Sequence, residues 1–264
     1  MARRLATLVA AVAVALTASV APAGAITNGT VDTDNDYPYV GMVTDFAFLC
    51  SGAAISPTIY VTAAHCFDDP VNPTHDPVPV AVTFSVDALT ALFVTGDFVT
   101  GTWHPDPQWC TACGPGLPGF DTHDVAVVVL DEPVDLPRYA NLPDEGLADG
   151  LANHAAVTNV GYGVNDFNRG GGPPGAVFDG LRRIAPAEVV ASNHVHSAEY
   201  LKFTLNGSQG KGGTCFGDSG GPNLLGNSDT ILSVNSYVTN GNCAGVGYSN
   251  RIDVGYALDF INSF

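Results

Sequence analysis

The chain has 264 residues, 46% of them hydrophobic, which is enough to bury one sizeable core or two smaller ones. Nine Lys and Arg against 26 Asp and Glu give a formal charge of −17, which argues against nucleic acid or an anionic membrane as a partner. The 30 Gly and 18 Pro separate many short β-rich runs and argue against a helical protein.

The first 25 residues have the pattern of a secretory signal peptide. Arg3 and Arg4 precede an apolar run, and small residues lead up to the expected cut after Ala25. A transmembrane anchor is the alternative, but the run is rich in alanine and the small-residue exit follows directly. Removing residues 1–25 takes away two arginines and no acid, so the formal charge moves from −17 to −19. We therefore expect a secreted, extracellular protein without a stable membrane association.

The rest of the chain, residues 26–264, predicts strands almost throughout. Apolar or alternating runs between Gly, Pro and Asn turns predict a first series of strands at 39–43, 46–55, 60–65, 80–86, 91–103 and 125–130. A second series is expected at 183–190, 199–205, 222–225, 230–238 and 246–252, preceded by a strand at 155–163. Residues 133–150 connect the two series, and 256–261 predict a short terminal helix. This pattern indicates an all-β architecture, although it does not by itself separate a barrel from a sandwich.

Three short motifs carry the chemistry. His65 ends the segment Thr-Ala-Ala-His, Asp124 directly precedes an apolar strand, and Ser219 lies in Gly-Asp-Ser-Gly-Gly-Pro. A serine hydroxyl becomes a useful nucleophile only when a neighbouring base takes its proton. In the order His, Asp, Ser these motifs resemble the trypsin/chymotrypsin family of serine endopeptidases, and the resemblance extends over the chain after residue 25. An α/β-hydrolase is excluded, because its catalytic residues follow one another along the chain as Ser, Asp and His, and no histidine follows Ser219 here.

The resemblance implies two six-stranded antiparallel β-barrels, at about 26–135 and 136–264, with the active site between them. His65 would then act as general base, Asp124 would fix its tautomer, and Ser219 would attack the peptide carbonyl. Asp121 is a rival for Asp124, but the apolar run after Asp124 favours the latter as the buried acid.

The resemblance also implies supporting groups around this triad. Backbone N–H groups of Gly217 and Ser219 would bind the developing oxyanion. Ser236 would contact the carboxylate of Asp124, with Ser233 as a nearby alternative.

The substrate pocket of such a protein would have Gly213 at its bottom and Val238 and Val246 on its walls. Glycine at the bottom predicts no strong preference for Lys or Arg, and two valines predict a narrow pocket for small apolar side chains. An insertion around Cys243 leaves a deeper pocket for larger apolar groups as the alternative.

Activation is a further expectation from the resemblance, in which the Ile26 amine pairs with Asp218. No Lys or Arg lies between residues 4 and 26, so we hypothesise that export cleavage after Ala25 frees this amine directly. An overlapping cleavage site would leave Gly24 as the first residue instead.

Six cysteines in an exported chain predict three disulfides. The resemblance implies two of the pairs, and parity leaves the third as a local Cys-x-x-Cys bridge: Cys50–Cys66, Cys215–Cys243 and Cys110–Cys113. A redox or zinc role for the last pair would need a thioredoxin-like context or a second cysteine pair, and the sequence has neither.

We therefore expect a secreted, monomeric serine endopeptidase that acts on polypeptides without a cofactor or metal. The acidic run at residues 32–36 lacks the glycine and the glutamate of a calcium loop. The alternative is a catalytically inactive binding protein of the same fold, which intact motifs at all three triad positions disfavour.

Overall fold

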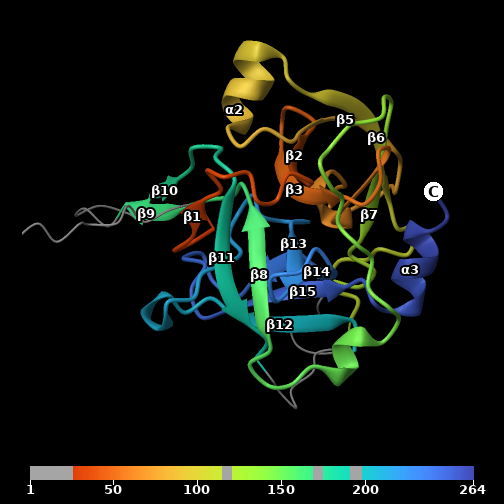
Figure 1. Cartoon of the computed structure of the whole chain (residues 1–264). Coiled ribbons are helices and arrows are strands. Elements are labelled where there is room, and N and C mark those ends of the chain that lie inside the picture. Colours follow the sequence, from red (N-terminus) through yellow and green to blue (C-terminus); the bar gives the residue numbers. More distant parts are fainter. Residues whose placement is uncertain (1–25, 115–120, 169–174, 191–197) are drawn as a thin grey trace, which may run out of the picture.

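The computed structural model describes residues 26–114, 121–168, 175–190 and 198–264, and these form two stacked β-structures (Figure 1). The first, in orange to yellow-green, lies above the second, in green to blue. The all-β fold predicted from the sequence is confirmed. The expected signal peptide lies outside the described residues. No helix within the described ranges has the length and apolar character needed to cross a membrane.

The first β-structure is a closed, antiparallel six-stranded barrel in the order β2-β3-β4-β7-β6-β5. Its strands are β2 (Val40–Thr44), β3 (Leu49–Ala54), β4 (Ile59–Thr62), β5 (Val78–Thr83), β6 (Val99–Pro105) and β7 (Ala126–Leu130). Strand β4 pairs with β7 so that Thr62 lies opposite Ala126. The segment that leaves β4 and the segment that enters β7 therefore meet at the same edge of the barrel.

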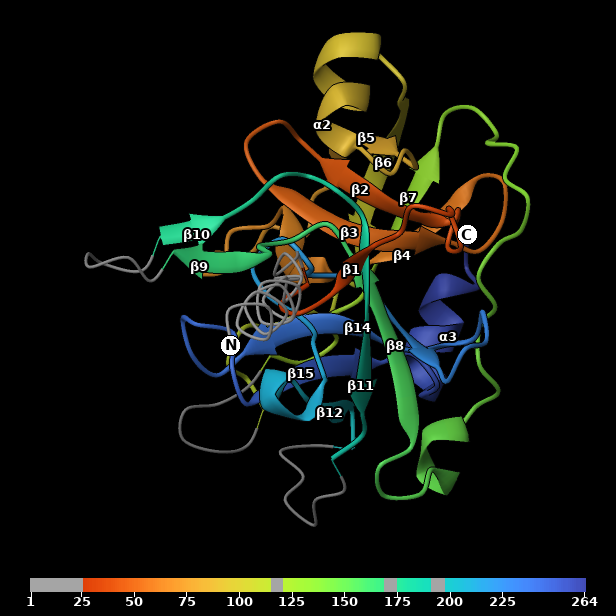
Figure 2. The ribbon, with the colours of Figure 1, turned by 60° about the vertical axis from the view of Figure 1, so that its left-hand side comes forward.

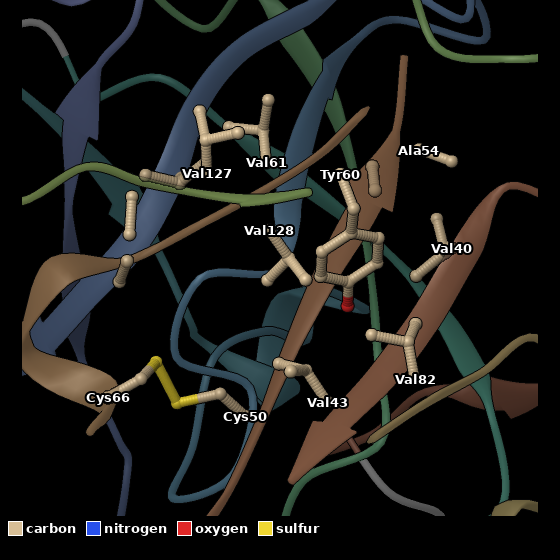
Figure 3. Packing of buried hydrophobic residues seen from close by; sticks show 14 of the residues in the cluster. Val40, Val43, Cys50, Ala54, Tyr60, Val61, Cys66, Val82, Val127 and Val128 are labelled. Carbon is tan, nitrogen blue, oxygen red and sulfur yellow. A yellow bond between two sulfur atoms is a disulfide. The ribbon is translucent and has the colours of Figure 1, made fainter. Parts of the chain in front are cut away.

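The interior of this barrel is filled by valines packed around one large ring (Figure 3). Tyr60 lies among Val40, Val82 and Val128, and its hydroxyl donates to the Gly41 carbonyl at 2.7 Å. Tyr60 and these three valines are 0% exposed. Burying side chains of this size contributes about 1.5–3 kcal/mol each, so the barrel edge is a rigid platform for the loops it carries.

The second β-structure is a seven-stranded antiparallel sheet in the order β1-β11-β8-β13-β14-β15-β12. Its strands are β1 (Thr30–Val31), β8 (Ala156–Gly161), β11 (Arg183–Glu188), β12 (Tyr200–Thr204), β13 (Pro222–Leu225), β14 (Ile231–Val238) and β15 (Val246–Arg251). A single bridge between Val189 and Phe203 links the ends of β11 and β12. The six strands expected here are present, and β1 adds a seventh at the edge. Among the described residues, β11 and β12 meet through this bridge and through the Val190 amide, which donates to the Lys202 carbonyl at 2.8 Å.

One predicted strand is wrong in its first half. The expected strand at 91–103 begins only at Val99, because α2 (Ala88–Thr90) and η2 (Ala91–Thr95) form a helical segment instead. The Asp87 carboxylate accepts from the Thr90 amide and caps this helix, and Gly96 ends it at φ +71°. These local caps outweigh the β propensity of the residues between them.

Short helical turns and one small hairpin complete the chain. They are η1 (Ala64–Cys66), η3 (Leu147–Gly150), η4 (Gly207–Gln209), β9 (Asp166–Asn168) and β10 (Gly175–Val177). The predicted terminal helix is confirmed as α3 (Gly255–Ile261), which lies beside the two β-structures (Figure 2). Ala257 and Ile261 are buried in the same cluster as the first barrel's core.

A buried ion pair ties the N-terminal segment to both halves. Arg182 Nε lies 2.8 Å from Asp32 Oδ2, and both side chains are fully buried. Arg182 Nη1 also donates to the carbonyls of Val40 and Phe84 in the first barrel, each at 2.9 Å. Removing one partner of a buried pair costs about 3–5 kcal/mol, so this network holds the halves in register.

Candidate active site

His65 lies in the turn η1, directly after strand β4. Two contacts hold this turn: Cys66 is bonded to Cys50 of β3, and Trp103 Nε1 donates to the Ala63 carbonyl at 3.2 Å. The imidazole is 23% exposed, whereas the residues before and after it are buried. The side chain is therefore fixed by the barrel and still accessible from solvent.

Asp124 holds His65 by two hydrogen bonds. Its Oδ2 is 2.8 Å from His65 Nδ1, and its Oδ1 accepts from the His65 backbone amide at 3.0 Å. The carboxylate is fully buried at the entrance to β7. With Nδ1 donating to the carboxylate, the other ring nitrogen, Nε2, is left as the proton acceptor.

The carboxylate has further support from the second half of the protein. The hydroxyl of Ser236, on β14, donates to Asp124 Oδ2, and Tyr200 Oη lies 3.2 Å from Ser236 Oγ. Ser233, the alternative considered from the sequence, is buried elsewhere on the strand. Asp121, the alternative acid, instead accepts from the Ala112 amide at 2.9 Å.

The electrostatics of the pair follow from this arrangement. Burial by itself would lower the pKa of His65, but the charge and hydrogen bond of Asp124, with a smaller contribution from Asp121, raise it above its ordinary value. Burial would raise the pKa of Asp124, and the opposing effects of His65 and Ser236 hold it below its ordinary value. The pair thus favours a charged aspartate beside a readily protonated imidazole.

Ser219 lies in the loop that meets the His65 turn from the second half. Its carbonyl accepts from the Ser51 amide at 2.8 Å, so it is bound to β3 of the first barrel. The next residue, Gly220, packs so closely on Thr62 that a Cβ there would lie 2.0 Å from the threonine hydroxyl. Only glycine permits this approach and the positive φ of +75°. The Ser219 hydroxyl makes no hydrogen bond to the described residues, and such contacts commonly tighten when substrate binds.

Two amide groups in this loop are free. The backbone N–H groups of Gly217 and Ser219 donate to no acceptor within the described part of the chain. Their neighbours differ, because the amides of Asp218, Gly220 and Gly221 are all bonded to carbonyls. Gly217 has φ +94°, which turns the loop so that it leaves two donors unused. Such a pair can bind an oxyanion.

Asp218 is buried and forms no ion pair with any of the residues that the structure describes. Its Oδ1 accepts from the Gly163 amide at 2.8 Å and its Oδ2 from the Cys215 amide at 2.9 Å. Burial raises its pKa to about 7, against the smaller opposing effects of these amides and of the Arg183 charge. Ile26 is also fully buried, but in the full chain its nitrogen is a peptide nitrogen. The expected pair between Ile26 and Asp218 therefore stays a prediction.

The predicted pocket residues lie on neighbouring segments but not in one cluster. Gly213 pairs with Thr27 and faces Leu205, whose Cδ2 would lie 2.4 Å from a Cβ at residue 213. Val238 packs with the Cys215–Cys243 disulfide, whereas Val246 packs with tyrosines of β12, β14 and β15. The contact of Leu205 with Gly213 gave no signal in the sequence.

All three expected disulfides are present in the structure. Sulfur and nitrogen atoms of Cys50, Cys66 and His65 lie within 4.8 Å of one another, which is close enough for a metal site. Both sulfurs are in the disulfide, however, so neither is a thiolate that could bind a metal.

Comparison with known proteins finds similar sequences and similar folds. A trypsin from Saccharopolyspora erythraea is 29% identical over 212 residues, covering 76% of this chain and 82% of that protein. The venom peptide isomerase heavy chain of Agelenopsis aperta is 23% identical over 240 residues, covering 85% and 92%. Among solved structures, human heparin binding protein matches with a TM-score of 0.63 at 17% identity, covering 89% of this chain and 95% of that one. HL collagenase matches with a TM-score of 0.62 at 18% identity, covering 89% and 96%.

At these identities the solved structures show similarity of the fold alone. The family model for trypsin, by contrast, matches residues 26–261, which is nearly all of the chain after the expected signal peptide. The chain therefore belongs to the trypsin family.

Proposed function

We propose that the protein is a secreted serine endopeptidase that forms an acyl-enzyme on Ser219. One observation carries the proposal: the loop that leaves the amides of Gly217 and Ser219 unused packs at Gly220 against Thr62 and Ala63, directly before the turn in which His65 pairs with Asp124. A base with a fixed tautomer and a vacant pair of donors are the two things that acyl transfer requires of a site.

The mechanism follows from these positions. His65 Nε2 takes the proton of Ser219 Oγ while Oγ bonds to the peptide carbonyl carbon, and the carbonyl oxygen becomes an oxyanion held by the two free amides. The carbon–nitrogen bond then breaks, and the leaving amine takes the proton from the imidazolium, which Asp124 stabilises. A water molecule then attacks the acyl-enzyme by the same steps, with His65 again as the base, and releases the carboxylic acid product from Ser219. Each oxyanion donor of this kind is worth about 2.7–4 kcal/mol in the transition state.

A catalytically inactive binding protein is the second candidate, since human heparin binding protein has the same fold. A formal charge of −17 disfavours a polyanionic ligand for this chain. A labelled fluorophosphonate probe separates the candidates. We expect labelling of the wild-type protein, none of Ser219→Ala, and retained labelling of Asp97→Asn, an exposed control. An unlabelled wild-type protein would favour the binding candidate.

We propose cleavage after small or apolar residues and not after Lys or Arg. Gly213 offers no carboxylate, and the side chains of Leu205 and Asn159 lie against it, which leaves a floor without a charged group. Burying a cation there without a partner is unfavourable. We expect peptides with Ala or Val before the scissile bond to be cleaved faster than those with Phe, and an Arg peptide to be cleaved slowest. Measuring kcat/KM over Ala, Leu, Phe and Arg tests this, and an Arg preference would refute it.

Activation by export cleavage is part of the same proposal. Ile26 is already buried, and Thr27 and Gly213 exchange two backbone hydrogen bonds at 3.1 Å beside the Ser219 loop. Cleavage after Ala25 would create an ammonium at Ile26, and Asp218 is a buried carboxylate that forms no ion pair within the described part of the chain. Mass spectrometry of the secreted protein gives the N-terminus directly. A fully active form that begins at Gly24 would show that this pair is not used.

A further inference from the structure

A cavity of about 510 Å³ lies next to His65 on the first barrel. Its walls include the rings of Phe48 and Phe67, with Asp45 and Asp69 also lining it. These residues come from the β2–β3 turn and from the loop after η1. Every described residue that lines the cavity belongs to the first half of the protein, whereas the expected pocket of Gly213 and its neighbours belongs to the second.

The position of the cavity decides which part of a substrate it receives. In the proposed function the acyl half of the substrate becomes bonded to Ser219, and its side chain would enter the pocket at Gly213 in the second half of the protein. The amine half takes its proton from His65 and therefore leaves past the first barrel. Leu49, next to Phe48, also contacts the oxyanion loop, since its Cδ1 would lie 2.9 Å from a Cβ at Gly217. The cavity thus adjoins residues on the C-terminal side of the scissile bond.

The apolar walls of the cavity suit a long side chain. Phe48 is 68% exposed, although an aromatic ring of this size gains by being covered. Phe67 is held in place by an edge-on contact with the buried Trp103, at 5.6 Å between ring centroids. A flexible aliphatic chain can lie along two such rings.

Asp45 and Asp69 each have one carboxylate oxygen fixed by backbone hydrogen bonds and one that is free to bind a ligand. Asp45 Oδ1 accepts from the Phe48 amide at 2.7 Å, and Asp69 Oδ1 accepts from the Val71 amide at 2.8 Å. The Oδ2 atoms of both side chains accept no hydrogen bond from the described residues. Asp68, between them in the cavity lining, differs, because amides or a nearby histidine occupy both of its oxygens. The backbone therefore holds two free carboxylate oxygens beside an aromatic wall.

We propose that this cavity binds a Lys or Arg side chain from the first two residues after the scissile bond. The stem of the side chain lies along Phe48 and Phe67, and its charged head pairs with the free oxygens of Asp45 and Asp69. The inference rests on the proposed function and adds a preference on the leaving side of the substrate. The preference weakens as ionic strength rises, because both carboxylates are reached by solvent.

Internally quenched peptides test the inference. They carry Ala before the scissile bond and Arg, Met or Glu at each of the first two positions after it. We expect kcat/KM to fall in the order Arg, Met, Glu, with a ratio of about threefold between Arg and Met for each carboxylate that pairs. In Asp45→Asn/Asp69→Asn the ratio of Arg to Met falls toward one, while asparagine keeps the Oδ1 acceptor that orders each loop. Asp97→Asn, which removes the same charge outside the cavity, keeps the wild-type ratio.

An acyl-peptide anilide separates this inference from the proposed function, because its leaving group has no side chain. If the wild-type protein hydrolyses neither anilide nor peptides, the proposed function fails and the inference with it. If it hydrolyses the anilide and the Met peptide but shows no Arg preference, the inference alone is overturned. A preference for Arg that survives in the double variant also overturns it.

Discussion

The two halves of the protein each contain a fully buried aspartate beside the candidate active site, and the two are in opposite electrostatic states. Asp124, in the first half, lies against His65 and accepts from Ser236. Among the described residues, Asp218, in the second half, accepts hydrogen bonds only from the backbone amides of Gly163 and Cys215. Both side chains have no exposed surface.

The difference appears in the direction of the two pKa shifts. Burial disfavours the charged form of both carboxyls, but the charge and hydrogen bond of His65 hold the pKa of Asp124 below its ordinary value. The two amides of the Asp218 site do not offset burial, and the pKa of Asp218 rises to about 7. Burial alone therefore does not decide the state of a carboxyl, because an ionisable partner that is directly hydrogen-bonded to it can offset the effect of burial. Asp124 has that partner within the folded chain, and Asp218 would gain it only from a free amine at Ile26.

The largest expected effect comes from removing the charge of Asp124. In Asp124→Asn the side chain can present its N–H group to Nδ1, which reverses the tautomer and removes the basic lone pair from Nε2. We expect kcat to fall by about 10⁴-fold while the fold is kept. Steady-state kinetics with a substrate that has Ala before the scissile bond measure this loss. Circular dichroism shows whether the variant is folded. Retained turnover would remove Asp124 from its assigned role.

The second effect concerns the partner that Asp218 lacks. We compare the chain that begins at Ile26 with the same chain acetylated on its α-amine. Losing one side of a buried ion pair costs about 3–5 kcal/mol, so we expect kcat/KM to fall by about 10²–10⁴-fold on acetylation. Asp218→Asn is the matched variant: it should already have the loss, and acetylating it should add little, because the two changes remove the same interaction. Equal activity of the free and acetylated chains would contradict the pairing.

The sequence predicts those features of the two aspartate sites that depend on a local pattern. The apolar run after Asp124 marked it as the buried acid, and the glycines around Ser219 marked a backbone forced into close contacts. The register of β4 with β7 then brings His65 and Asp124 together, and this follows from strand pairing that no single motif contains.

Other features depend on contacts between residues far apart in the chain. Arg182 and Asp32 are 150 residues apart and pair only once both halves have folded. Leu205 reaches Gly213 through the same long-range packing. The free carboxylate oxygens of Asp45 and Asp69 could not be predicted either, because an acidic loop usually indicates no more than a solvated surface. Nor does propensity alone predict the helix at 88–95, since its caps override the β-forming residues inside it.

The third and smallest effect is the dependence of stability on pH. With a blocked Ile26 amine, Asp218 has a folded-state pKa of about 7 against an ordinary value of 3.8. Between these values the folded protein holds a proton that the unfolded chain has released. The stabilisation is therefore fully present below about pH 4 and is lost as pH rises to about 7, by at most about 4 kcal/mol.

Denaturant unfolding of the acetylated and free-amine chains, both carrying Ser219→Ala to prevent self-digestion, measures this loss. In the free-amine chain the Ile26 ammonium keeps Asp218 charged, so this particular loss should disappear. Because the self-repulsion of a highly acidic chain acts on both forms alike, the informative quantity is the difference between their free energies of unfolding. We expect that difference to grow from pH 4 to pH 7 and to vanish in Asp218→Asn. A difference that does not change with pH would mean that Asp218 gains no cation from Ile26, and the contrast between the two buried aspartates would then need another cause.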